Sequence, residues 1–280
     1  MGAPLDPHEP YEAPAADLAA AKPSRRFHRS AVEPSPLVDA DEELHLRLGY
    51  EAEVRCVDRV LGELLRTWDE QARRRAGVVL ATSDHGQGLG EHGYPGHGFF
   101  LYEEQLHVPL LLRASGVLAP QRVARPTSSV DVARTLLELA DCEGPSGLEG
   151  QSLTRFLGPH APAEPFVAER SEWSEFDVAG RGEVQRLLGL RAGEAGVTLE
   201  PLTSWVDGSH KLIWNSRTVC ELYDLAQYPA EAHNLIDTHR PQAERLREAM
   251  ELWRAGLCAE VWAESTVSTE RLEALRALGY

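Results

Sequence analysis

The sequence of 280 residues has little positive charge and few cysteines. Its 28 basic residues stand against 44 acidic ones, and the net charge of -16 argues against nucleic acid or an anionic membrane as a partner. No apolar run approaches the roughly 18 residues of a membrane helix, and the N-terminus lacks the basic start and apolar stretch of a signal peptide. The localisation therefore stays open. If the substrate is an anion, the positive charge that attracts it must come from a metal or from a few side chains positioned at the site.

The four cysteines lie far apart in the chain. Cys56, Cys142, Cys220 and Cys258 show no C-x-x-C spacing, so neither a zinc knuckle nor a disulfide scaffold is indicated. We expect four structural thiols.

Prolines and apolar periodicity divide the chain. Residues 1–40 contain seven prolines, which forbid any long helix and predict an irregular surface segment. From residue 41, apolar side chains recur at helical spacing as far as Trp68, which predicts one long amphipathic helix. Residues 78–83 are a short apolar run with β-branched side chains, typical of a strand buried on both faces.

A helix, a buried strand and a glycine-rich loop, in that order, are typical of a doubly wound α/β sheet. Residues 108–112 predict another buried strand, and residues 132–139 predict a short helix capped by Ser or Asp. We therefore expect residues 41–160 to belong to an α/β domain with a mostly parallel sheet and flanking helices.

Residues 161–280 have a different pattern. Short candidate strands at 166–168, 187–190 and 210–214 are separated by glycine-bearing turns and are followed by a helix at 242–253. We expect a smaller α+β lobe here.

The densest polar group follows the predicted strand at 78–83. Asp84 and His85 are adjacent at its carboxyl end, and His92 and His97 follow in a glycine-rich loop. A carboxylate beside an imidazole suits zinc or manganese, and a single imidazole does not exclude calcium. The alternative is that Asp84 caps the loop and the histidines are exposed turn residues, since no H-x-x-x-H or H-E-x-x-H pattern is present.

A second candidate lies near the N-terminus. Prolines at positions 7 and 10 flank His8, and their restricted backbone would fix the direction of the imidazole, as suits a group preorganised for a charged substrate. The alternative is an incidental histidine in a proline-rich arm.

Several segments match the motifs of one family, in the family's order and across essentially the whole chain. They are D-P-H-E-P-Y at 6–11, Y-E-A-E-V at 50–54 with V-D-R-V-L-G at 57–62, S-D-H-G at 83–86 with L-G-E-H-G at 89–93, L-Y-E-E-Q-L-H-V-P-L at 101–110, V-D-V-A-R-T-L-L at 130–137, L-E-G-Q-S-L at 148–153, and E-L-Y-D-L at 221–225 with Pro229, Glu231 and Asn234-Leu235. Together these segments resemble the sulfatase family of the alkaline phosphatase superfamily.

The resemblance implies a metal-dependent sulfuric ester hydrolase acting on a small-molecule or glycan sulfate ester. It places Asp84 and His85 among the ligands of a divalent metal, calcium first, with manganese or zinc as alternatives. It also places His8 and His97 against the sulfate group, as substrate-binding and catalytic residues. We therefore expect these four residues to converge in one pocket.

The same resemblance implies a different role for Glu91 and His92. Both lie in the loop that carries Asp84 and His97, and we expect them to contribute loop packing rather than metal ligands.

The sequence also departs from the family. Sulfatases carry, before the D-x-H-x-P-Y segment, a strand ending in paired aspartates and a C/S-x-P-S-R motif whose Cys or Ser becomes the formylglycine nucleophile, and neither is found here. Residues 21–25 read A-K-P-S-R, but they lie after His8, and the methyl group of Ala21 cannot attack sulfur. The resemblance thus implies the C-terminal part of a sulfatase, truncated and inactive alone.

Two alternatives stay open. One is a phosphodiester or phosphonate ester hydrolase of the same superfamily, because Asp-His ligation and a histidine at position 97 also occur in that branch. The other is a non-catalytic remnant that binds a metal or a partner.

Overall fold

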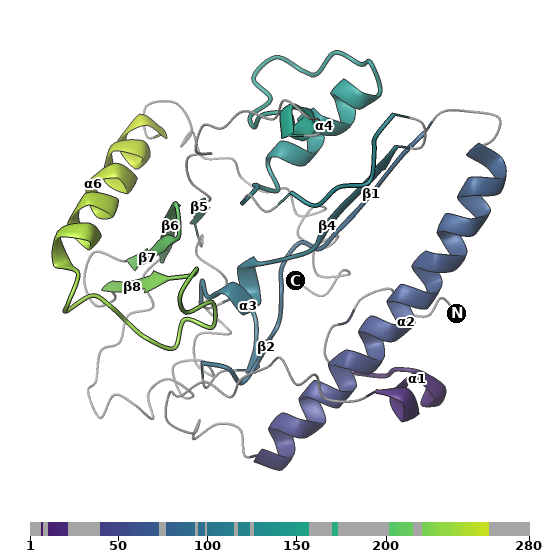
Figure 1. Cartoon of the computed structure of the whole chain (residues 1–280), viewed down its shortest axis with the longest axis horizontal. Coiled ribbons are helices and arrows are strands. Elements are labelled where there is room, and N and C mark those ends of the chain that lie inside the picture. Colours follow the sequence, from purple (N-terminus) through teal and green to yellow (C-terminus); the bar gives the residue numbers. More distant parts are fainter. Residues whose placement is uncertain are drawn as a thin grey trace, which may run out of the picture.

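A computed structural model describes the chain over residues 7, 11–21, 40–72, 77–92, 95–98, 100–114, 117–123, 126–156, 170–172, 202–214 and 220–257. Figure 1 shows the long helix α2 along one side, the strands β1 and β4 next to it, and a separate sheet covered by helix α6. No helix in these ranges is long and apolar enough to cross a membrane.

Two helices of very different length form the N-terminal part. Helix α1 (Ala15–Ala20) has only six residues, follows Pro14, and packs on α2 (Ala40–Ala72). The 33 residues of α2 confirm the predicted long helix. Glu43 pairs with Arg47 and Glu51 with Arg55 one turn along, as such spacing favours on a helix surface.

Strands β1 (Val78–Thr82) and β4 (Leu110–Ala114) confirm the two strands expected in this region, with β4 beginning just after Pro109. They pair antiparallel, with Val78 opposite Ala114. The expected mostly parallel sheet is not confirmed, because every strand pair among the described residues is antiparallel. Residues 78–81 are half-buried rather than buried. An apolar run by itself carries no information on the direction of the partner strand.

A short hairpin and one helical turn connect β1 to β4. The hairpin consists of β2 (Gly88–Leu89) and β3 (Pro95–Gly96), and α3 (Glu103–Leu106) follows it. The amide of Gly86 donates to the carbonyl oxygen of Gln105 at 2.7 Å. A Cβ atom at position 86 would overlap the backbone of Glu104, so this contact requires glycine.

Helix α4 (Asp131–Leu139) is tied to the 3-10 helix η1 (Leu153–Phe156) by buried polar groups. The expected Ser or Asp cap is not confirmed, because α4 begins without a side-chain cap. The buried Asp131 carboxylate instead accepts the amide of Gln151 at 2.8 Å. This bond brings the chain after α4 back against the start of the helix.

The C-terminal sheet has the strand order β5 (Arg170–Glu172), β6 (Thr203–Asp207), β7 (His210–Trp214) and β8 (Cys220–Asp224). Helix α6 (Arg240–Leu257) packs on it, and their shared core contains Trp205, Leu212, Leu222, Ala243, Leu246 and Met250. The predicted strand at 210–214 and helix at 242–253 are confirmed. The candidate strands at 166–168 and 187–190 lie outside the described residues.

The described cysteines are free thiols. Cys56 is buried, as expected of a structural thiol, whereas Cys142 and Cys220 are exposed. Cys258 lies outside the described residues.

The α4–η1 connection predicts unequal costs for two glycine substitutions. Gly147 (φ 84°) and Gly150 (φ 86°) both have left-handed backbones, but a Cβ atom at 150 would lie 2.5 Å from the carbonyl oxygen of Val130, whereas the space at 147 is open. We expect Gly147→Ala to lower the free energy of unfolding by about 1–2 kcal/mol, the cost of the left-handed conformation. Gly150→Ala should cost a further 1–3 kcal/mol or so from overpacking. Equal losses in urea unfolding would contradict this account.

Candidate functional site

Asp84 and His85 directly follow β1 in a turn held by local hydrogen bonds. Oδ1 of Asp84 accepts the backbone amide of His85 at 2.9 Å, and the hydroxyl of Ser83 donates to the carbonyl oxygen of His85 at 2.7 Å. Aspartate and serine commonly stabilise turns in this way. The Asp84 side chain is 61% exposed, so its carboxylate faces solvent at the end of the strand.

The His85 ring is oriented by its own loop. Nδ1 lies 2.8 Å from the carbonyl oxygen of Gly86, and because a carbonyl can only accept, Nδ1 carries the proton. Nε2 then carries the lone pair in the neutral ring, which is the arrangement commonly seen in metal-binding histidines. The loop therefore presents Nε2 rather than Nδ1 as a possible ligand.

The hairpin brings His97 onto His85. The two rings are stacked, with centroids 3.8 Å apart and an interplanar angle of 18°. This follows from the hairpin register, because Gly88 pairs with Gly96 and so brings the residues on either side of the hairpin together. The structure therefore places the ring of His97 on that of His85, which directly follows Asp84. His8 lies outside the described residues, and the convergence of all four residues in one pocket stays a prediction.

Asp84 and His85 fit a divalent cation in chemistry and in spacing. Nε2 of His85 lies 3.9 Å from Oδ1 of Asp84, and metal–ligand distances of about 2.0–2.6 Å allow one ion to contact both atoms. A carboxylate oxygen suits calcium, and a nitrogen with an oxygen suits manganese or zinc. The pair supplies two ligands, fewer than the four of a closed zinc site or the six to eight of a calcium site.

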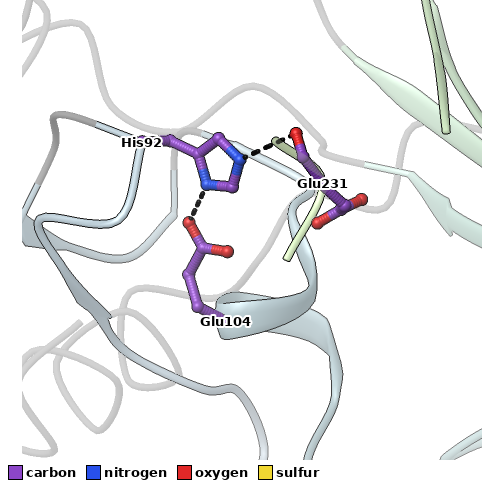
Figure 2. A group of neighbouring side chains, drawn as sticks. All are labelled: His92, Glu104 and Glu231. Atoms are coloured by element: carbon purple, nitrogen blue, oxygen red, sulfur yellow. Dashed lines mark hydrogen bonds and ion pairs between the residues drawn. The ribbon is translucent and has the colours of Figure 1, made fainter. Parts of the chain in front are cut away.

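A second polar cluster lies at the tip of the hairpin (Figure 2). His92 sits between Glu104 of α3 and Glu231, a residue of the loop after β8. Its Nδ1 is 2.6 Å from Oε1 of Glu104, and its Nε2 is 3.5 Å from the carbonyl oxygen of Glu231. Ligand atoms of the three residues lie within 4.8 Å of one another, which is compatible with a metal ion.

The charges in this cluster favour the binding of a proton over the binding of a metal ion. Nζ of Lys211 lies 2.9 Å from Oε1 of Glu231 and 2.8 Å from Oε1 of Glu103, and the Lys211 side chain is fully buried. The ammonium therefore already places a positive charge beside these carboxylates, and a divalent cation next to it would be repelled. We interpret the cluster as a network of hydrogen bonds and ion pairs that joins the hairpin to the C-terminal sheet.

Ionisation within the network follows from burial and pairing. Burial lowers the pKa of His92, but the hydrogen bond and charge of Glu104, together with Glu231, outweigh it and raise the pKa above its ordinary value. Both ring nitrogens face acceptors, which suits the protonated ring. Burial raises the pKa of Glu231, against the opposing effect of Lys211.

Two tyrosines form a further contact between the hairpin region and the C-terminal sheet, to which Tyr223 belongs. The Tyr102 ring stacks on His92 at 3.7 Å, and the hydroxyls of Tyr102 and Tyr223 each donate to Oε2 of Glu221 at 3.1 Å. Burial and the charge of Glu221 raise the pKa of both tyrosines. Both hydroxyls therefore stay protonated and keep donating.

Sequence reasoning identified part of this network. Glu91 accepts the amide of Leu89 and pairs with Arg47 at 3.0 Å, which agrees with the loop packing expected of it, whereas for His92 that assignment stays a prediction. The charged role of Lys211 was missed. A single lysine inside the otherwise apolar strand at 210–214 was the available signal, but its partner carboxylates are distant in sequence.

Comparison with known proteins identifies the family. The sulfatase family model matches residues 3–142, which is half of the chain. The chain belongs to the sulfatase family. The matched half contains the turn after β1, the hairpin and α3, while Lys211 and Glu231 lie beyond it.

Individual relatives are similar over most of the chain. An uncharacterized sulfatase, YidJ, from Escherichia coli (strain K12) is 28% identical over 256 residues, which cover 84% of this chain and 46% of the relative. An N-acetylglucosamine-6-O-sulfatase from Bacteroides thetaiotaomicron is 26% identical over 239 residues, 84% of this chain and 40% of the relative. The chain thus spans less than half the length of these sulfatases.

A solved structure agrees with the α/β fold. The phosphonate monoester hydrolase of Agrobacterium radiobacter superposes with a TM-score of 0.63 and 26% identity, over 83% of this chain and 45% of that protein. The similarity therefore extends to a relative named for a different ester.

The raised pKa of His92 predicts how stability depends on pH. Protonated His92 contributes its full stabilisation below the unfolded pKa of about 6.5, and this contribution is lost as the pH rises through the higher folded pKa. We expect the free energy of unfolding to fall as the pH rises above about 6.5, measured by urea unfolding with an NMR titration of the ring. His92→Gln should flatten this dependence, while the exposed His107→Gln should preserve it. A steep fall that persists in His92→Gln would refute the assignment.

Proposed function

We propose that these 280 residues contribute part of the active site of a sulfuric ester hydrolase. Asp84 and His85 bind the metal in this proposal, and His8 and His97 contact the sulfate group. One observation carries it: the ring of His97 stacks on that of His85 at the end of β1. Two positions that belong to separate parts of the sulfatase motifs in the sequence thereby lie next to each other in space.

The residues suit the chemistry of sulfate ester hydrolysis. A bound divalent cation supplies positive charge toward the sulfate oxygens. Asp84 offers an anionic oxygen, and His85 offers Nε2 because its Nδ1 is held by the carbonyl of Gly86. His97 lies beside them, where an imidazole can donate a proton to the departing alcohol.

The remaining ligands and the nucleophile come, in this proposal, from a polypeptide segment outside these 280 residues. The length of the relatives supports it, because this chain matches 46% and 40% of the two sulfatases compared above. Without that segment, we infer that the chain is inactive.

We further propose how the chain divides. Residues 1–40 form the arm that carries His8, residues 41–160 the end of the catalytic α/β domain, and residues 161–280 the C-terminal lobe. In the doubly wound sheet, a strand outside this chain would run parallel to β1, whose one described partner is β4.

The name of one relative supports a substrate class. One relative is named an N-acetylglucosamine-6-O-sulfatase, which supports a glycan or small-molecule sulfate ester here. Calcium is the first metal we assign, because the exposed Asp84 carboxylate offers the hard oxygen that calcium prefers. Manganese and zinc are the alternatives.

The second candidate is hydrolysis of a phosphonate or phosphate ester. The structural match to a phosphonate monoester hydrolase supports it, because sulfate and phosphonate esters both present tetrahedral oxyanions to the same groups. A protein joining residues 1–280 to the N-terminal part of a sulfatase relative would separate the two by its relative rates on nitrophenyl sulfate and a nitrophenyl phosphonate. Binding of metal without either turnover would favour a non-catalytic remnant.

The ligand count predicts weak metal binding by the isolated chain. With only Asp84 and His85 as assigned ligands, we expect calcium or manganese to bind no tighter than roughly millimolar, the weak end for oxygen-rich sites. We also expect no metal-dependent hydrolysis of nitrophenyl sulfate. Isothermal titration calorimetry measures the affinity, which Asp84→Ala should weaken further. Asp237→Ala, at an exposed carboxylate elsewhere, is the matched control.

Micromolar affinity, or turnover that Asp84→Ala abolishes, would show that this chain holds further ligands and a nucleophile of its own. Ser83, at the same strand end, would then be the first residue to test.

A further inference from the structure

The hairpin that carries His97 is held at its tip by two other parts of the chain. His92, in the turn between β2 and β3, is bonded through Nδ1 to the side chain of Glu104 and lies 3.5 Å through Nε2 from the carbonyl oxygen of Glu231. The tip of the hairpin therefore contacts both α3 and the loop after β8 (Figure 2).

Helix α3 is in turn fixed to the C-terminal sheet through Glu103. The Glu103 carboxylate accepts a hydrogen bond from Nζ of Lys211 at 2.8 Å, and the Glu103 amide donates to Oε2 of Glu231 at 2.6 Å. The side chains of Lys211 and Glu231 are both 0% exposed and lie 2.9 Å apart. Both the backbone and the side chain at the start of α3 are thus bonded to one buried pair.

The other end of α3 touches the residue after His85. The amide of Gly86 donates to the carbonyl of Gln105 at 2.7 Å, and position 86 has no room for a Cβ atom beside Glu104. Backbone is packed directly on backbone here, so a displacement of α3 displaces the loop that holds His85.

A buried ion pair is a costly way to stabilise a fold. Apolar side chains of similar volume are often as stable or more so, because the desolvation of two charges offsets their attraction. Apolar contacts lack direction, however, whereas hydrogen bonds fix the position of the groups they join. A pair such as Lys211 and Glu231 is therefore better suited to fixing a geometry than to raising stability.

We propose that Lys211 and Glu231 are positioning residues for His85 and His97. The pair fixes α3, α3 fixes the turn after β1 through Gly86, and His92 fixes the hairpin that carries His97. The inference rests on the proposed function only for the role of the two histidines. Their positions can be measured without an assay of enzyme activity.

The test replaces both charges in the 280-residue chain with apolar side chains of similar length, Lys211→Met together with Glu231→Met. The readouts are the nuclear Overhauser effect between ring protons of His85 and His97, assigned with His85→Gln and His97→Gln, and the midpoint of urea unfolding. We expect the cross-peak to be lost while the midpoint is retained. A retained cross-peak in the folded double variant would overturn the proposal.

The matched control removes an exposed ion pair of the same sheet. Asp207 on β6 and Arg245 on α6 lie 2.7 Å apart, with side chains 38% and 55% exposed. Asp207→Asn with Arg245→Met should leave both the cross-peak and the midpoint unchanged. Loss of the cross-peak in this control as well would show that the stack responds to any change in the lobe, and would overturn the specific role.

If the double variant does not fold, a milder variant provides the test. Glu103→Met removes the side-chain bond to Lys211 but keeps the buried pair and the amide bond to Glu231. We expect a weakened cross-peak and shifted imidazole resonances for His85 and His97. Unchanged resonances would overturn the proposal. Metal affinity and hydrolysis do not enter these readouts, so failure of the sulfate ester assignment would appear separately.

Discussion

A single buried ammonium group, that of Lys211, determines how the separate parts of this chain meet. Taking a charge out of water is expensive unless oppositely charged groups replace the solvent. Its two carboxylate partners, Glu103 and Glu231, come from α3 and from the loop after β8. Glu231 belongs to the same C-terminal part as Lys211, whereas Glu103 reaches the ammonium only when α3 lies against the C-terminal sheet. The second ion pair therefore ties the position of α3 to the buried charge.

The hairpin adds a second constraint at the candidate site. Its strands are two residues each, too short to hold a fixed position by themselves. Contacts outside the hairpin supply the order: Arg47 of α2 binds Glu91, and Tyr102 stacks on His92. The position of the stacked histidines thus depends on charged and aromatic groups outside the hairpin.

The excess of acidic over basic residues in the chain bears on how the candidate site could attract an anion. With a net charge of -16, the molecule as a whole repels anions, so attraction of a sulfate or phosphonate group depends on local charge. A cation at Asp84 and His85 would supply it close to the reacting group.

The local elements and the family can be read from the amino-acid sequence. The apolar period before Trp68 specified α2, the β-branched run at 78–82 specified β1, and the ordered motifs specified a sulfatase. These features are readable because periodicity and motif spacing are properties of neighbouring residues. Tertiary structure alone decided that β1 pairs antiparallel with β4, that His97 lies on His85, and that Lys211 is buried. Each of these depends on groups distant in the chain, since a strand edge, a ring face or a charge acquires its partner only when the fold brings the two together.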